Sequence, residues 1–187
     1  MQATVSGVKI SGMCSTVPDN VQKFEDDMKH FPFSEKSSLK LAKVMGFKEH
    51  RVSDPQTAHC NLATYTLNYM IHKGYINRDI IQAMIVVSQS QDHPVPGNSK
   101  VIHGLAELPR SVYCMDLYEN CIGFISGLYA ACSIISGSGV EEVLNGYYQK
   151  FNTGGQDRKC SWFFLSVTVI LSFDSFNFSR TQGRKYA

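Results

Sequence analysis

The stretch that decides the fold is Met115–Phe124, which reads MDLYENCIGF. It joins a strand pattern that ends at Leu117 to an apolar segment, Cys121–Ile135. That segment is apolar nearly all round, so we predict a buried central helix that starts at the cysteine. Gly137 and Gly139 are placed to end this helix, because glycine readily adopts the backbone conformation that closes a helix.

Outward from this stretch, strand and helix patterns alternate along the chain. Ile81–Ser88 contains a continuous apolar run, Ala83–Val87, which is typical of a strand buried on both faces of a sheet. The other predicted elements are strands over Val5–Ser11, Val112–Leu117 and Glu142–Tyr148, a helix over Asn61–Lys73 with Thr57 as a candidate N-cap and Gly74 at its end, and a helix over Ser99–Leu108. This order predicts an α/β fold with a mostly parallel sheet covered by helices.

Length and composition exclude several classes of protein. With 187 residues, the chain is one domain or one half of a two-lobed protein. A net charge of +2 without a basic run argues against a nucleic-acid partner. No segment reaches the ~20 apolar residues of a membrane span, and the closest, Trp162–Phe173, is too short. Because Met1–Gly12 has no signal-peptide core and the six cysteines form no C-x-x-C pair, we expect reduced thiols and a cytoplasmic location.

Cys121 is the candidate nucleophile. The first amides of a helix have no partner within the helix, and their positive field favours a thiolate. The same amides can donate to a developing oxyanion. Gly123 would let backbone or substrate approach the sulfur closely. The local pattern leaves an alternative open, in which Cys121 is a small buried hydrophobic residue, the commoner role of a cysteine.

No other cysteine or histidine has a comparable setting. Cys132 is expected in the core, and Cys14, Cys60, Cys114 and Cys160 have no context beyond packing. His93 lies in a proline-bounded loop, where it faces a ligand or, as we favour, packs in the loop or at the surface. None of the six histidines has metal-ligand spacing with another histidine or cysteine. We therefore predict no metal site and no permanently bound cofactor.

Several segments occur in the order in which one enzyme family has them. They are Gly46–Arg51, Ile85–Pro96 with its Asp92-His93 pair, Asp116–Leu128 around Cys121, the helix-ending Gly137 and Gly139, and Gln156–Arg158. On these residues the chain, from Val8 to about Gly146, resembles β-ketoacyl-[acyl-carrier-protein] synthase III, a thiolase-fold condensing enzyme. The match implies a thiolase-like half whose central helix starts at the nucleophile, Cys121.

The resemblance also implies an activity and partners. In such acyltransferases of fatty-acid or related biosynthesis, the cysteine takes an acyl group from coenzyme A. The acyl group then condenses with a malonyl thioester on acyl carrier protein (ACP), with loss of carbon dioxide. The resemblance thus implies acyl-CoA or acyl-ACP as substrate, ACP as partner, and a homodimer or heterodimer of thiolase-like chains.

The sequence departs from the family pattern in three places. The family's second half supplies a histidine and an asparagine that have no counterpart here, and neither His93 nor His103 replaces them. The segment between Ser34 and Gly46 lacks the tryptophan and arginine that often clamp coenzyme A, which leaves a carrier-bound donor open. Val95 stands where many relatives place a larger side chain near the partner's acyl pocket.

The end of the chain also differs from the family pattern. We expect a thiolase-like N-terminal domain over residues 1–158 and an atypical tail over residues 159–187, without the second thiolase half. One hypothesis is a frameshift near Lys159–Phe164 that replaced the second half by an out-of-frame tail. The alternative is a divergent strand over Phe163–Leu171, which its β-branched residues allow. Ser172–Ala187 is polar and is expected to be poorly ordered.

Two further functional hypotheses follow from these departures. The chain would be a non-catalytic thiolase-like subunit that works by pairing with an active partner, or it would be an inactive fragment. In each case, a half that lacks its neighbour keeps an exposed apolar face.

Overall fold

The computed structural model describes residues 4–46, 48–54, 56–152 and 162–173. Its elements in chain order are β1 Val8–Thr16, β2 Asn20–Lys23, α1 Phe24–Asp27, η1 Met28–His30, α2 Glu35–Met45, β3 Glu49–Val52, α3 His59–His72, η2 Arg78–Ile80, β4 Ala83–Val87, α4 Asn98–Leu105, β5 Tyr113–Leu117, α5 Gly123–Ser138, β6 Glu142–Asn152 and β7 Trp162–Phe173. The α/β fold predicted from the sequence is confirmed.

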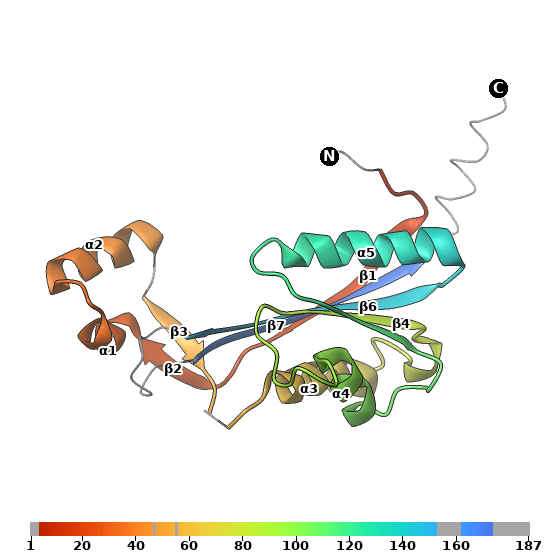
Figure 1. Cartoon of the computed structure of the whole chain (residues 1–187), viewed down its shortest axis with the longest axis horizontal. Coiled ribbons are helices and arrows are strands. Elements are labelled where there is room, and N and C mark those ends of the chain that lie inside the picture. The colour runs from red at the N-terminus through yellow and green to blue at the C-terminus, as the bar shows by residue number, and fades with distance from the viewer. Residues whose placement is uncertain (1–3, 47, 55, 153–161, 174–187) are drawn as a thin grey trace.

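The strands form one mixed sheet with helices on both faces. Its order is β2-β3-β7-β6-β4-β5, and β1 also pairs with β7. The predicted parallel arrangement holds for β4, β5 and β6, whereas β7 runs antiparallel to both β6 and β1. Figure 1 shows α5 on one face of the sheet and α3 and α4 on the other, with α1 and α2 at one end.

β4 is the centre of the core, as its apolar run predicts. All five of its residues are buried. Met84 and Val86 pack into a cluster with α3 and α4, and the three alternate residues, Ala83, Ile85 and Val87, pack into a cluster with α5. The strand therefore has no polar face because each of its faces is covered by a helix.

α5 differs from the prediction of a helix buried on all sides. It begins at Gly123 rather than Cys121, and it buries one face through Gly123, Gly127, Ala131 and Ile135. These residues are four apart, so they lie in one line along the helix. The apolar side chains on other faces remain exposed; Ile122 beside the helix, Ile125 and Tyr129 have exposed fractions of 66%, 60% and 46%. The helix therefore carries more apolar side chains than this chain alone buries.

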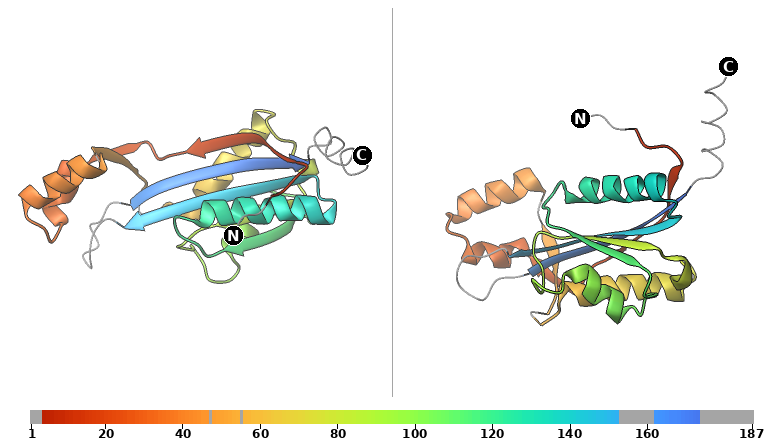
Figure 2. Two further views of the ribbon diagram at one scale, coloured as in Figure 1. Left: turned by 90° about the horizontal axis from the view of Figure 1, so that it is seen from above. Right: turned by 45° about the vertical axis from the view of Figure 1, so that its right-hand side comes forward.

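Residues after the predicted boundary at 158 contribute a strand to the same sheet. Of the two interpretations of Phe163–Leu171, the strand is observed: β7 lies between β6 and β1, as Figure 2 shows with β7 in blue between cyan β6 and red β1. Thr168, Val169, Ile170 and Leu171 are buried in the core. The frameshift hypothesis concerns the gene and stays a prediction.

Several sequence predictions fall outside the described residues. These are the Gln156–Arg158 segment, Cys160 and the part of the polar tail from residue 174 onward. Among the residues that the structure does describe, no helix is long and apolar enough to cross a membrane.

Candidate active site

Cys121 lies in the turn between β5 and α5. Its side chain is exposed, and it precedes the first residue of α5 by two positions, with Ile122 as the N-cap. The amide of Gly123 donates to the carbonyl of Asn120 at 2.8 Å and closes this turn. The amides of Ile125 and Ser126 then donate to the carbonyl of Ile122 at 3.0 and 3.2 Å. The alternative of a buried, core-packed Cys121 therefore does not describe this structure.

Gly123 has a different role from the one that the sequence suggested. A Cβ atom on Gly123 would lie 2.6 Å from Cβ of Glu119 and 2.6 Å from Cγ1 of Val87. A Cβ atom on Gly127 would lie 2.7 Å from Cγ2 of Val87 and would also meet Oδ1 of Asn145. Protein atoms, rather than a substrate, occupy the space at Gly123. Both glycines let α5 lie close to the end of β4, and this fixes where the Cys121 turn begins.

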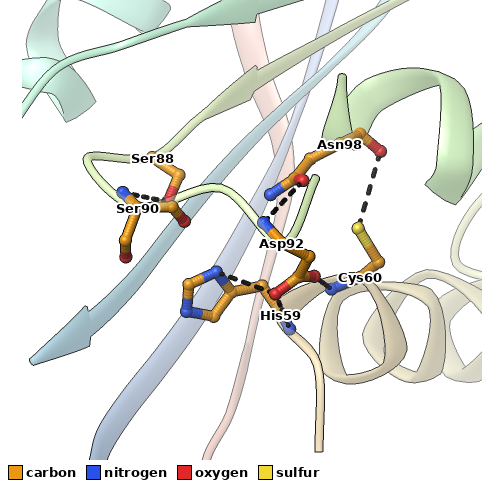
Figure 3. Close-up of polar contacts among 6 residues, drawn as sticks. All are labelled: His59, Cys60, Ser88, Ser90, Asp92 and Asn98. Atoms are coloured by element: carbon orange, nitrogen blue, oxygen red, sulfur yellow. Dashed lines mark hydrogen bonds and ion pairs between the residues drawn. The ribbon is translucent and has the colours of Figure 1, made fainter. Parts of the chain in front are cut away.

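A second cysteine, Cys60, lies near a histidine and a carboxylate, as Figure 3 shows. The Asp92 carboxylate accepts hydrogen bonds from the backbone amides of His59 and Cys60 at 3.0 and 2.8 Å. Its Oδ1 is also 3.5 Å from Nδ1 of His59. The Cys60 thiol points to the carbonyl of Asn98, with 3.9 Å between sulfur and oxygen.

The electrostatics of this cluster keep Cys60 protonated. Burial raises the pKa of the Cys60 thiol far above its usual range, and the nearby Asp92 carboxylate raises it further. Burial opposes ionisation of Asp92 as well, but the amides of Cys60 and His59 outweigh it and hold the pKa of this carboxyl below its usual range. The thiol is therefore held neutral and the carboxylate charged, and the hydrogen bonds of Asp92 anchor the loop after β4 to the start of α3.

Asp116 makes a similar anchor at α4. Its carboxylate accepts from the Ser99 amide at 2.8 Å, the Ser99 hydroxyl at 2.6 Å and the Lys100 ammonium at 2.9 Å. Sequence reasoning placed both Asp92 and Asp116 in family segments but missed that each binds a helix N-terminus. The signal was present, because Asp116 lies near the carboxyl end of β5 and Asp92 lies in the loop after β4, where helix starts gather.

The remaining predicted residues have ordinary surroundings. His93 is exposed, as is Val95, which is 86% exposed. His103 Nε2 lies 3.0 Å from the carbonyl of Pro109. Burial raises the pKa of the Cys132 thiol, and Cys132 packs against the core cluster under α5. No group of three histidine, cysteine or acidic side chains suited to a metal ion occurs within the described ranges.

Comparison with known proteins finds relatives of this chain by sequence. No protein-family model matches the chain. It is 29% identical over 145 residues to a Campylobacter jejuni protein assigned as 3-oxoacyl-(acyl-carrier-protein) synthase 3. The aligned region covers 77% of this chain and 41% of that protein. A β-ketoacyl-ACP synthase III of Chlorobaculum tepidum is 28% identical over 100 residues, covering 53% of this chain and 30% of that protein.

Solved structures agree with these sequence relatives on the fold. A 3-oxoacyl-(acyl-carrier protein) synthase of Burkholderia xenovorans has a TM-score of 0.81 at 19% identity, over 92% of this chain and 50% of that one. At such identity the likeness establishes the fold alone. The chain spans less than half of the length of the sequence relatives, 41% of the C. jejuni protein. The predicted resemblance is confirmed: over most of its length this chain is similar to proteins named β-ketoacyl-ACP synthase III, and it has a thiolase-like fold.

Proposed function

We propose that the chain carries the acyl-accepting cysteine of a condensing enzyme of the β-ketoacyl-ACP synthase III type. The Cys121 thiolate attacks the thioester carbonyl of an acyl donor, a new sulfur–carbon bond forms, and the donor thiol leaves. Loss of carbon dioxide from malonyl-ACP then supplies the carbanion that attacks the acyl group and frees the Cys121 thiolate. A covalent intermediate divides one difficult step into two easier ones.

The observation that carries this proposal is the exposed Cys121 in the turn before α5. α5 has 16 residues, and the positive end of its dipole lies at that turn. Such dipoles stabilise a thiolate and the oxyanion of an acyl-transfer intermediate. The amide of Gly123 already donates to the carbonyl of Asn120. Other amides of the turn would therefore donate hydrogen bonds to the oxyanion.

The test is transfer of an acyl group to the purified chain. Acyl-CoA and acyl-ACP are offered separately, and the adduct is located by mass spectrometry. We expect an adduct on Cys121 that is lost in Cys121→Ala and kept in Cys132→Ala, which changes a half-buried thiol within α5. An adduct that survives Cys121→Ala, or no adduct on the folded chain with either donor, would contradict the proposal.

A non-catalytic, pairing subunit is the second candidate. The observation that favours it is the apolar outer face of α5, where Ile125 and Tyr129 are 60% and 46% exposed. A chain of this kind would form a stable complex with an active thiolase-like chain and take no acyl group. Size-exclusion chromatography of the two chains together, alongside the adduct assay, separates this candidate from the first.

A further inference from the structure

We propose that Tyr147 of β6 is a positioning residue for the Cys121 turn. This inference rests on the proposed function, since it assigns a role toward the acyl-accepting cysteine. Tyr147 contacts the turn on both sides of Cys121. Its hydroxyl donates to the carbonyl of Asn120 over 3.5 Å, a long hydrogen bond, and its ring meets the Phe124 ring edge-on, with centroids 6.0 Å apart at 83°.

The strand register places Tyr147 under this turn. β6 runs parallel to β4, and Tyr147 pairs with Val87, the last residue of β4. A Cβ atom on Gly123 would lie 3.7 Å from Cε2 of Tyr147, so the Tyr147 ring and Val87 both lie next to Gly123. Val87 and Tyr147 together pack against Gly123, the first residue of α5.

The hydroxyl contact bears on the orientation of one peptide group. The Asn120 carbonyl accepts from both Gly123 N, at 2.8 Å, and Tyr147 Oη. This carbonyl and the amide of Cys121 belong to one planar peptide unit, in which they point in opposite directions. Two donors on the carbonyl therefore fix the direction of the Cys121 N–H. An N–H of fixed direction beside the thiol is a preorganised donor for the acyl-transfer oxyanion.

The neighbouring Tyr148 supplies a matched control. It is on the same strand but on the opposite face of the sheet, in the cluster with α3 and α4. Its hydroxyl bonds Oγ1 of Thr168 at 3.2 Å, and burial raises its pKa to about 12. Removing its hydroxyl disturbs a tyrosine of the same strand without touching the Cys121 turn.

The experiment compares two reactions of Cys121 in the full chain carrying Tyr147→Phe or Tyr148→Phe. Acyl transfer from acyl-CoA passes through an oxyanion, whereas alkylation by iodoacetamide is a direct displacement that forms none. We expect Tyr147→Phe to slow acylation about 3- to 10-fold, less than complete loss of an oxyanion donor, with alkylation unchanged within about twofold. Tyr148→Phe should leave both rates unchanged.

The inference is overturned if Tyr147→Phe acylates at the wild-type rate, or if acylation and alkylation fall together with the unfolding midpoint, which marks a purely structural role. Should Tyr147→Phe not fold, Phe124→Leu weakens the other contact of Tyr147 with the turn, its edge-on ring contact, and is judged by the same two rates. A wild-type chain that alkylates but takes no acyl group refutes the proposed function, and this inference with it. An acylated wild type with an unaltered Tyr147→Phe refutes the inference alone.

Discussion

Two cysteines of this chain lie at helix starts, and their surroundings are opposite. Cys60 is the second residue of α3, where the Asp92 carboxylate accepts from the amides of His59 and Cys60. Cys121 lies two residues before α5, whose N-cap makes no side-chain hydrogen bond. The first thiol is buried and held protonated, and the second is exposed. The two helix starts therefore hold their thiols in different surroundings, one buried next to a carboxylate and one exposed to solvent.

The largest expected effect is a difference in labelling between these two thiols. At neutral pH, iodoacetamide should label Cys121 at least about 100-fold faster than Cys60, because reaction needs both access and thiolate. Peptide mapping after timed quenching measures both rates in one sample. Labelling in urea should remove the difference. Equal rates in the folded chain would break the comparison, since the two environments would then have no chemical consequence.

Removal of the carboxylate at α3 has the next largest effect. Asp92→Ala should lower the free energy of unfolding by about 2–3 kcal/mol, since two amides of a helix start lose a charged acceptor. Urea denaturation measures this. Asp54→Ala is the matched control, because Asp54 accepts one amide, from Gln56 at 2.9 Å, on the surface. Equal losses in the two variants would mean that Asp92 does not anchor α3.

The pH dependence of the same anchor has a definite sign. The pKa of Asp92 is lower in the folded chain than its ordinary value of about 3.9. Its stabilisation is therefore complete above that ordinary value and is lost as the pH falls through the lower, folded one. The stability difference between wild type and Asp92→Asn should shrink below about pH 4. A difference that stays constant down to pH 2 would contradict this assignment.

A smaller effect is expected at the close approach of α5 to β4. Gly123→Ala should cost about 1–3 kcal/mol, because its Cβ would meet Val87 and Glu119 at 2.6 Å. Gly137→Ala is the control on the same helix, with no heavy atom within 4 Å of the added carbon. That variant should gain up to about 1 kcal/mol, since alanine favours a helix over glycine. Thermal unfolding of both variants measures the contrast, and a stable Gly123→Ala would exclude tight packing here.

Local patterns predicted the elements whose cause is local. The apolar run of β4 was sufficient to predict this strand. Because both of its faces are buried, apolar and polar residues do not alternate along it. Gly74 and Gly139 follow their helices with φ of 72° and 70°, the left-handed conformation in which glycine is favoured. Cys121 was predicted as the first residue of the helix, whereas it lies in the turn two residues before α5. Whether this thiol accepts an acyl group stays a prediction.

Features that depend on distant partners could not be read from the sequence. Thr57 was the candidate cap of α3, but Ala58 is the N-cap, and the acceptor is Asp92, more than thirty residues along the chain. Nothing near Ala58 encodes that contact. Tyr147 lies 27 residues from Asn120, so its contact with the Cys121 turn depends on the register between β6 and β4. Because α5 is apolar on nearly all sides, its sequence likewise did not indicate which of its faces packs against the sheet.

A carboxylate introduced at the start of α5 should make the surroundings of Cys121 more like those of Cys60 at the start of α3. Ile122, the N-cap, is 66% exposed, so an aspartate there costs little burial. Ile122→Asp should gain about 0.5 kcal/mol, the low end of capping effects, because φ of −79° and ψ of −13° are helical rather than the extended values that capping residues prefer. Its carboxylate would take first-turn amides and add negative charge beside the sulfur. We therefore expect alkylation of Cys121 to slow about 2- to 5-fold.

Ile122→Asn separates the two contributions in that variant, since asparagine caps about as well as aspartate but carries no charge. If it matches Ile122→Asp in stability yet alkylates faster, charge beside the sulfur controls the thiol. If the two alkylate equally slowly, occupation of the amides is the cause. Wild-type alkylation rates in both variants would show that the start of α5 has no influence on Cys121, and the contrast with Cys60 would then reduce to exposure alone.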